Sequence, residues 1–188
     1  HYAKNTPFYS MAGTDQYGKG DAKKAAALIA AAKYDGTPIK ILTSQQYDFH
    51  YRIALVMAEN LKAAGFKTDM QVVDWSTLIQ RRNDPALWDI YITHSAVLPE
   101  PTLTPPQLGD GAPGWWSSPA KDAALAAFNA ETDPKKREEL IKAALREYRE
   151  QFTALPLHRQ VIPWASRGNV TVVHRADNFV TPYWTTVQ

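Results

Sequence analysis

Residues 34–94 alternate between strand-like and helix-like patterns, and this alternation limits the possible folds more than any other feature of the chain. Three short runs rich in apolar, β-branched and aromatic residues, at 39–43, 67–73 and 88–93, are typical of strands. The segments between them have the spacing of helices. Strands that alternate with helices are joined by right-handed crossovers and form parallel sheets. We therefore predict an α/β fold in which a mainly parallel sheet is flanked by helices.

Local signals mark the ends of the two helices between these strands. Ile53, Met57 and Leu61 recur at every fourth position and so share one face of the first helix. Gly65 follows that face, where a glycine can end a helix in a left-handed conformation. Asp74 precedes the second helix and can accept hydrogen bonds from its first backbone amides.

Two further helices are predicted in the second half of the chain. Ser118 followed by Pro119, and Asp133 followed by Pro134, each provide a capping side chain and a proline suited to the first helical position. The apolar faces of these helices are expected to contain Leu125 and Phe128, and then Ile141, Leu145, Tyr148 and Phe152.

Residues 95–116 differ from the rest of the chain. They include five prolines and three glycines, which exclude a regular element. Loops longer than about 12–15 residues in a compact domain are usually functional or disordered. The paired indoles of Trp115 and Trp116 would be costly to leave in water, so a structured loop is predicted.

Composition and motifs argue against several classes of function. A net charge of +2 does not indicate a nucleic-acid partner. The chain has no cysteine, and its histidines, at 1, 50, 94, 158 and 174, lack the spacing of a zinc site. Neither a Gly-x-Ser-x-Gly elbow nor a His-Glu-x-x-His helix is present. A binding protein without catalytic residues, metal or cofactor is predicted. The alternatives are an α/β hydrolase or transferase acting on a small polar substrate, and a purely structural lobe.

The string ALVMAENLKAAGFKTDMQVVDWSTLIQRRNDPALWDIYI resembles the second lobe of the family 5 extracellular solute-binding proteins. These are the dipeptide-, oligopeptide- and nickel-binding subunits of bacterial ABC importers. The flanking strings DAKKAAALIAAAKYDG and SSPAKDAALAAFNAETDPKKREELIKAALREYREQFTALPLH are similar to the helices that precede and follow that unit in the family. The resemblance implies a lobe like those of type II periplasmic binding proteins.

The same resemblance implies how the chain is organised. Residues 1–20 would connect a first lobe to this one, and residues 21–188 would form the second, ligand-binding lobe of a larger two-lobed protein. The chain is therefore expected to be an excised lobe whose first lobe is missing. The implied partners are that first lobe, a small-molecule or peptide solute and an ABC permease in the membrane. The implied location is the periplasm, with a lipid anchor on the full-length protein as a variant.

Ligands of open α/β sheets bind outside the carboxyl ends of the strands, which makes Tyr47 a candidate for stacking on a solute. The resemblance adds the loop after the third strand, the residues before the helix that begins at Pro119, and a returning strand at 155–162. On this basis the remaining ligand-binding candidates are His94, Ser95, Ala96, Gly114, Trp115, Trp116 and His158. His50, in the first turn of a helix, is expected to be neutral and to have no particular role.

Peptide binders of the family usually carry an aspartate near positions 114–117, which would pair with the α-ammonium group of the peptide. This chain has Gly114, Trp115, Trp116 and Ser117 there. A neutral, sugar-like or aromatic-stacking ligand is therefore an open alternative to a peptide.

Overall fold

A computed structural model of the chain describes residue 4 and residues 7–15, 17–95, 100–103, 111–158, 165–171 and 186–187. The chain divides into two compact units. We call Gln16–His94 the sheet unit, and His1–Asp15 with Ser95–Gln188 the helical unit. Each is described by itself below.

The sheet unit contains three parallel strands in the order β2-β1-β3. Strand β1 is Ile39–Ser44, β2 is Thr68–Val73 and β3 is Ile90–Tyr91. Residue Ile41 of β1 pairs with Met70 of β2 on one side and with Ile90 of β3 on the other. The predicted parallel sheet is thus confirmed, with β1 at its centre.

Strand β3 is shorter than predicted, because the Asp89 side chain makes the first hydrogen bond to β1 in place of a backbone carbonyl. The Asp89 carboxylate accepts a hydrogen bond from the backbone N–H of Lys40 at 2.7 Å, while the Asp89 N–H donates to the Lys40 carbonyl at 3.0 Å. Trp88 instead ends the short 3₁₀ helix η1, Pro85–Leu87, and its indole N–H donates to the Arg82 carbonyl at 3.1 Å. The prediction of a strand over 88–93 was wrong at both of its ends.

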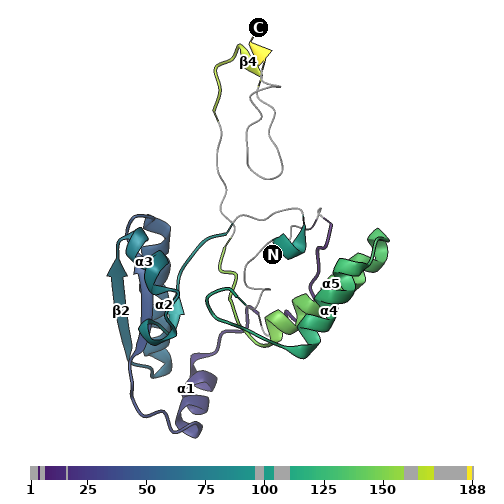
Figure 1. Cartoon of the computed structure of the whole chain (residues 1–188). Helices are drawn as coiled ribbons and strands as arrows, with labels where there is room; N and C mark the ends of the chain where they lie inside the picture. The colour runs from purple at the N-terminus through teal and green to yellow at the C-terminus, as the bar shows by residue number, and fades with distance from the viewer. Residues whose placement is uncertain are drawn as a thin grey trace. The chain divides into compact units, whose positions relative to one another are not determined.

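Helix α1 is Ala22–Ala31, α2 is Asp48–Ala64 and α3 is Trp75–Arg81. Figure 1 shows α2 and α3 beside the strands and α1 below them. Helix α2 covers one face of the sheet, where Ile41 and Ile92 pack against Ala54 and Ala58. Leu42 points to the opposite face, since side chains alternate along a strand, and is fully buried. The crossover from β1 to β2 and the crossover from β2 to β3 run in opposite directions along the sheet. Right-handed crossovers that run in opposite directions place their helices on opposite faces of the sheet.

Helix α2 ends at Gly65, as predicted. Gly65 has a φ of 106°, a left-handed conformation that is unfavourable for any residue with a Cβ. Its N–H donates to the Lys62 carbonyl at 2.9 Å, and the N–H of Phe66 donates to the Leu61 carbonyl at 3.0 Å. The Phe66 ring then meets Tyr34 edge-on with the ring centres 5.1 Å apart. This pair of hydrogen bonds is the Schellman arrangement.

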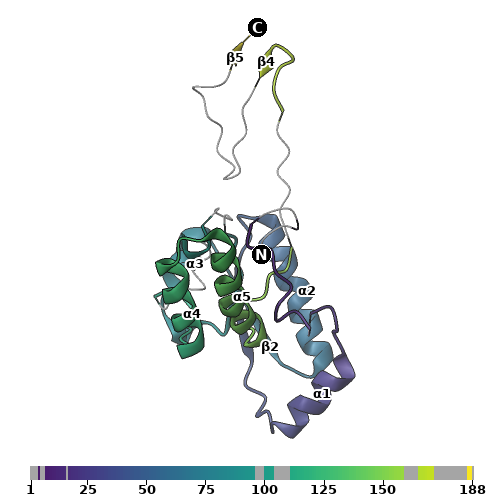
Figure 2. The ribbon, with the colours of Figure 1, turned by 90° about the vertical axis from the view of Figure 1, so that its right-hand side faces the viewer.

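The helical unit is built on helix α4, Pro119–Ala130, and helix α5, Pro134–Glu150, which lie side by side in Figures 1 and 2. Ser118 and Asp133 accept hydrogen bonds from the backbone amides of Lys121 and Lys136, so both predicted caps are confirmed. The core between the helices contains Phe128, Ile141, Ala144 and Leu145.

Phe152 does not belong to the buried face of α5, contrary to prediction. The helix ends at Glu150, and Phe152 has a φ of 51° and is 49% exposed. The turn after the helix rotates its side chain away from the row formed by Ile141, Leu145 and Tyr148. The helical unit also contains the 3₁₀ helix η2, Pro101–Leu103, and an antiparallel pair of short strands, β4 at Val170–Thr171 and β5 at Thr186–Val187.

Residues from the beginning of the chain pack against α4 and α5. The Arg149 guanidinium donates to the Ala12 carbonyl at 2.6 Å, and the Phe8 ring meets Phe128 edge-on at 5.7 Å. Gly13, with a φ of 73°, lies so close to α5 that a Cβ there would come within 2.7 Å of the Arg146 carbonyl oxygen. The start of the chain is therefore part of the helical unit by contact as well as by position.

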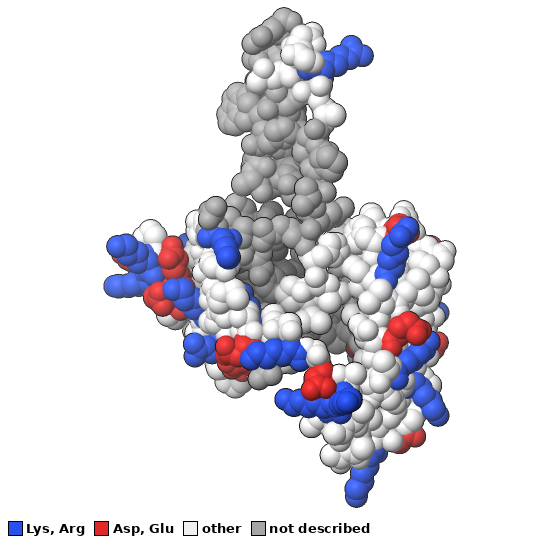
Figure 3. Space-filling model, turned by 180° about the vertical axis from the view of Figure 1, so that it is seen from behind, with Lys and Arg blue, Asp and Glu red and all other residues white. Residues whose placement is uncertain are grey.

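Among the described residues, no helix combines the length and the apolar character needed to cross a membrane. Basic and acidic side chains are interspersed over the face shown in Figure 3. The described part of this face therefore lacks the continuous basic surface typical of nucleic-acid binding.

Candidate functional site

Five rings gather at the carboxyl ends of the three parallel strands. Tyr47 follows β1, Trp75 follows β2 and His94 follows β3, so each strand contributes one ring. Phe49 and His50, in the first turn of α2, complete the group. We call these five residues the ring cluster. The cluster lies where open α/β sheets bind ligands, because the loops at this edge come together there.

The contacts within the ring cluster are close. The Tyr47 ring meets Trp75 edge-on at 5.0 Å and His94 edge-on at 4.9 Å, measured between ring centres. Trp75 and His94 stack at 5.5 Å with 20° between their planes. Tyr47 and His94, which the sequence singled out separately, are thus in direct contact across the edge between β1 and β3. In an order that begins 2-1-3, this edge is the switch point where ligands bind.

The two histidines of the cluster share a hydrogen bond. Nδ1 of His94 and Nε2 of His50 lie 3.1 Å apart. One of these nitrogens must donate and the other accept, and the tautomers decide which. His50 is completely buried and its ring centre lies 4.3 Å from that of Phe49. The first-turn position on α2 thus brings His50 under the strand ends. These contacts alone do not test the expectation that His50 has no particular role.

The capping of α3 fixes the position of Trp75. The Asp74 carboxylate accepts hydrogen bonds from the Ser76 hydroxyl at 2.6 Å and from the backbone N–H of Thr77 at 2.9 Å. These bonds, the one from Ser76 first, hold the pKa of the Asp74 carboxyl far below its usual value. Trp75 is consequently the first residue of a firmly capped helix. Trp75 was missed as a site candidate, although it comes soon after the end of a strand, as Tyr47 and His94 do.

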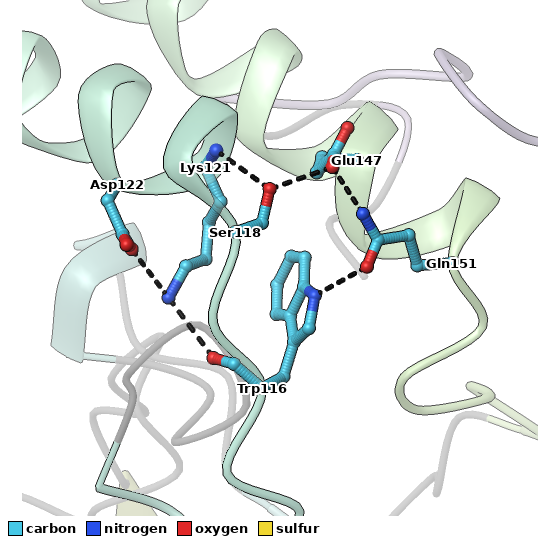
Figure 4. A network of polar contacts seen from close by, with 6 residues as sticks. All are labelled: Trp116, Ser118, Lys121, Asp122, Glu147 and Gln151. Carbon is cyan, nitrogen blue, oxygen red and sulfur yellow. Dashed lines mark hydrogen bonds and ion pairs between the residues drawn. The ribbon is translucent and has the colours of Figure 1, made fainter.

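In the helical unit, Trp116 is held by a chain of polar contacts between α4 and α5 (Figure 4). Its indole N–H donates to the Gln151 side-chain oxygen at 2.8 Å, and the Gln151 amide donates to Glu147. The Ser118 hydroxyl donates to the same Glu147 oxygen at 2.8 Å, which closes the chain at the start of α4. These partners hold Trp116 as part of the scaffold.

Lys121 approaches Trp116 from the other side (Figure 4). Its ammonium nitrogen lies 5.1 Å from the ring centre, donates to the Trp116 carbonyl at 3.3 Å and pairs with Asp122 at 2.8 Å. Only 1% of the Lys121 side chain is exposed, so these interactions compensate a buried charge.

Trp115 differs from its neighbour. It is 42% exposed and has a φ of 43°, in the left-handed region that a bulky residue rarely adopts. Its N–H donates to the Ala112 carbonyl at 2.8 Å, and the preceding Gly114 has a φ of 108°. The chain thus turns sharply at these two residues, with Trp116 anchored behind them. Local strain of this kind is concentrated at functional sites.

The other predicted site residues have no defined arrangement in common. Ser95 is exposed beside His94, and Ala96 lies outside the described residues. His158 is exposed, and residues 155–158 do not form the predicted strand. Pro156 within this stretch lacks the amide donor that a ladder needs. Residues 159–162, the rest of that predicted strand, lie outside the described residues. The described residues also contain no group of three or more side chains suited to hold a metal ion.

The sequence matches a family of known proteins over more than half its length. Residues 2–114 match the middle region of the bacterial extracellular solute-binding proteins, family 5. The chain belongs to this family. The family binds solutes outside the cytoplasm, so the match gives no support to the hydrolase or transferase alternative.

Solved structures share the fold of the chain. A dipeptide-binding protein from a Pseudoalteromonas species, in complex with Met-Leu, has a TM-score of 0.73 at 20% identity, and the match covers 89% of this chain and 36% of that one. A periplasmic murein tripeptide-binding protein in an unliganded open form has a TM-score of 0.58 at 27% identity, over 70% and 27% of the two chains.

A third structure, a periplasmic binding protein from Agrobacterium fabrum in complex with stachyose, has a TM-score of 0.63 at 16% identity, over 80% of this chain and 27% of that one. The chain thus spans about a third of the length of these proteins or less. The type II periplasmic-binding-protein fold that the sequence predicted is confirmed.

Proposed function

We propose that the protein to which this chain belongs captures a small solute outside the cytoplasm and delivers it to the membrane permease of an ABC importer. One observation carries the proposal: a chain of a solute-binding family has aromatic rings from three separate loops at the carboxyl edge of its sheet. Flat rings with polar tips supply the stacking faces and the few directed hydrogen bonds that small polar ligands need.

The proposal assigns the chain to the second lobe of a two-lobed protein. Residues 1–20 would connect the lobes and residues 21–188 would form the binding lobe. The length of the solved proteins that share the fold supports this assignment. The lobes would close on the solute by a hinge motion, and the permease would recognise the closed form. A periplasmic location, free or with a lipid anchor, follows from the same family role.

Within this lobe we assign solute contact to Tyr47, Trp75 and His94 of the ring cluster. Gly114 and Trp115 of the helical unit stay separate predictions from family resemblance. Trp116 supports Trp115, because its indole N–H and its ring face are both occupied by scaffold side chains. Ser95, Ala96 and His158 remain predictions from family resemblance.

Two classes of solute fit these groups. Proteins with the same fold have been solved with the dipeptide Met-Leu and with the oligosaccharide stachyose. Positions 114–117 offer no carboxylate for the ammonium group of a peptide. Stacking rings with neutral hydrogen-bonding tips favour a ligand with an apolar face and neutral polar groups, such as a saccharide or a peptide held by its backbone.

The test is mass spectrometry of the small molecules that the whole protein retains when it is purified under native conditions and then denatured. We expect one solute class to be released in roughly equal amount to the protein. If none is retained, and if a panel of dipeptides, tripeptides and neutral oligosaccharides leaves the melting temperature unchanged, the proposal is contradicted.

Two tryptophans of the sheet unit provide a matched pair of variants. Trp75 lies at the carboxyl edge, whereas Trp88 precedes β3 and packs against Tyr91 with the ring centres 4.7 Å apart. Trp75→Ala should weaken binding of the recovered solute by about 5- to 100-fold, as expected for a buried aromatic contact. Trp88→Ala should leave affinity within about 3-fold in protein that remains folded, because it lies at the other end of the strand. Equal losses in both variants would remove the carboxyl edge as the site.

A further inference from the structure

We propose that His50 is a positioning residue for His94, which holds the exposed imidazole in the orientation that the ring cluster presents to a solute. The part of this inference that concerns the solute rests on the proposed function. The part that concerns the two histidines rests on their geometry alone.

The two rings have unequal environments. His50 is completely buried in the first turn of α2, whereas His94 is exposed after β3. The 3.1 Å contact between His50 Nε2 and His94 Nδ1 links the buried ring to the exposed one. A buried ring in a helix has few rotamers, so it can fix the orientation of an exposed ring on a loop.

The hydrogen bond to His50 uses one of the two ring nitrogens of His94 and leaves the other for a solute. Since Nδ1 of His94 is engaged by His50, Nε2 is the ring nitrogen that a solute at this edge can reach. The tautomer of His50 then decides whether that Nε2 donates or accepts. His50 therefore influences which solute group His94 can bind without touching the solute itself.

The facing nitrogens can share a single proton. In the neutral pair one nitrogen donates and the other accepts, but a protonated imidazole has only donors. When only one ring is protonated, its N–H can still donate to the nitrogen of the other ring, so the contact holds in the neutral pair and in the singly protonated pair.

The first experiment uses nitrogen-15 NMR of the histidine side chains in the 188-residue chain without solute. At pH 7.5 we expect the two facing nitrogens to give one donor and one acceptor signal. In His50→Phe the His94 signals should change in position. If the His94 signals are the same in His50→Phe as in the unmodified chain, the inference is overturned.

The second experiment measures affinity of the whole protein for its recovered solute at pH 7.5. Phenylalanine keeps a ring at position 50 but cannot make the hydrogen bond, so His50→Phe should weaken binding about 5- to 10-fold, the effect of losing one hydrogen bond. Gln can donate and accept, so His50→Gln should recover most of the affinity.

The two experiments fail in different ways. An unaltered affinity in His50→Phe would overturn the positioning role even if the NMR signals of His94 change. Absence of any retained solute would contradict the proposed function, while the NMR experiment would still decide whether His50 holds His94.

Discussion

In the sheet unit, three loops from three strands each contribute one ring to the cluster, whereas in the helical unit a single tryptophan is fixed by polar side chains of two helices. The ring cluster follows from topology, because parallel strands must deliver their carboxyl ends to one edge. The position of Trp116 follows from individual side chains, since Gln151 accepts from its indole N–H and Lys121 lies over its ring, while Glu147 accepts from Gln151.

This difference shows two ways of presenting aromatic groups to a ligand. A sheet edge keeps its rings together as long as the strands pair. A loop before a helix needs explicit anchors, and Trp115 is presented in a strained conformation next to an anchored neighbour. We therefore expect the sheet edge to tolerate single changes better than the loop that contains Trp115.

The largest effect is expected in the core of the helical unit. Phe128 is fully buried, and the guanidinium of Arg137 lies 4.1 Å from its ring centre. Phe128→Ala should reduce the free energy of unfolding by about 3–5 kcal/mol in urea denaturation, as large-to-small changes of buried phenylalanines do. Leu125→Ala, on the same helix but only half-buried, is the control and should cost less. Equal losses would mean that Phe128 is not the centre of this core.

A close approach in the helical unit gives the next largest effect. A Cβ on Gly13 would meet the Arg146 carbonyl oxygen at 2.7 Å and the Arg146 Cα at 2.9 Å, in addition to the cost of a φ of 73°. Gly13→Ala should therefore cost roughly 1–3 kcal/mol more than a change at a glycine limited by its φ alone, the amount typical of overpacking. Urea denaturation measures it, and a loss no larger than that of Gly65→Ala would show that the start of the chain does not pack on α5.

Gly65 of the sheet unit isolates the cost of conformation. It has a φ of 106°, and nothing lies within 4 Å of the position of its Cβ. Gly65→Ala should reduce the free energy of unfolding by about 1–2 kcal/mol, the cost of a left-handed conformation. Gly111, which has equally open surroundings but no left-handed φ, is the matched control, and Gly111→Ala should be near neutral. A stable Gly65→Ala chain would contradict the Schellman end of α2.

The smallest effect concerns the cap that positions Trp75. Because the folded pKa of Asp74 lies below the unfolded value, its ionisation stabilises the fold fully above about pH 4 and less as the pH falls further. Asp74→Asn still caps the helix but cannot ionise. The difference in stability between the two chains should therefore shrink as the pH is lowered from about 5 to 2.5 in acid denaturation. A difference that is independent of pH would show that the carboxylate charge is not what Ser76 and Thr77 stabilise.

Features set by local spacing could be predicted from the sequence. The parallel strands, the glycine at the end of α2 and the caps at Asp74, Ser118 and Asp133 depend on residues at most a few positions apart, and all are confirmed. Tyr47 was found because it follows a strand, and His94 was found separately from the family resemblance. Their contact required knowledge of the strand order.

Features that depend on distant side chains could not be predicted. The burial of His50 results from three loops converging over α2, and Gln151, which accepts from the Trp116 indole N–H, lies 35 positions further along the chain. Strand β3 is shorter than predicted because the Asp89 carboxylate accepts a hydrogen bond from the Lys40 backbone N–H, and these residues lie 49 positions apart. Phe152 was misassigned because the helical period was continued past the end of α5.

The most direct test of the account is a comparison of tryptophan indole N–H signals in the NMR spectrum of the whole protein before and after addition of the solute recovered from it. The account predicts that the Trp75 signal shifts on binding and that the Trp88 signal, at the opposite end of β3, does not. A shift of Trp88 with no change at Trp75 would contradict the assignment of solute binding to the carboxyl edge of the sheet.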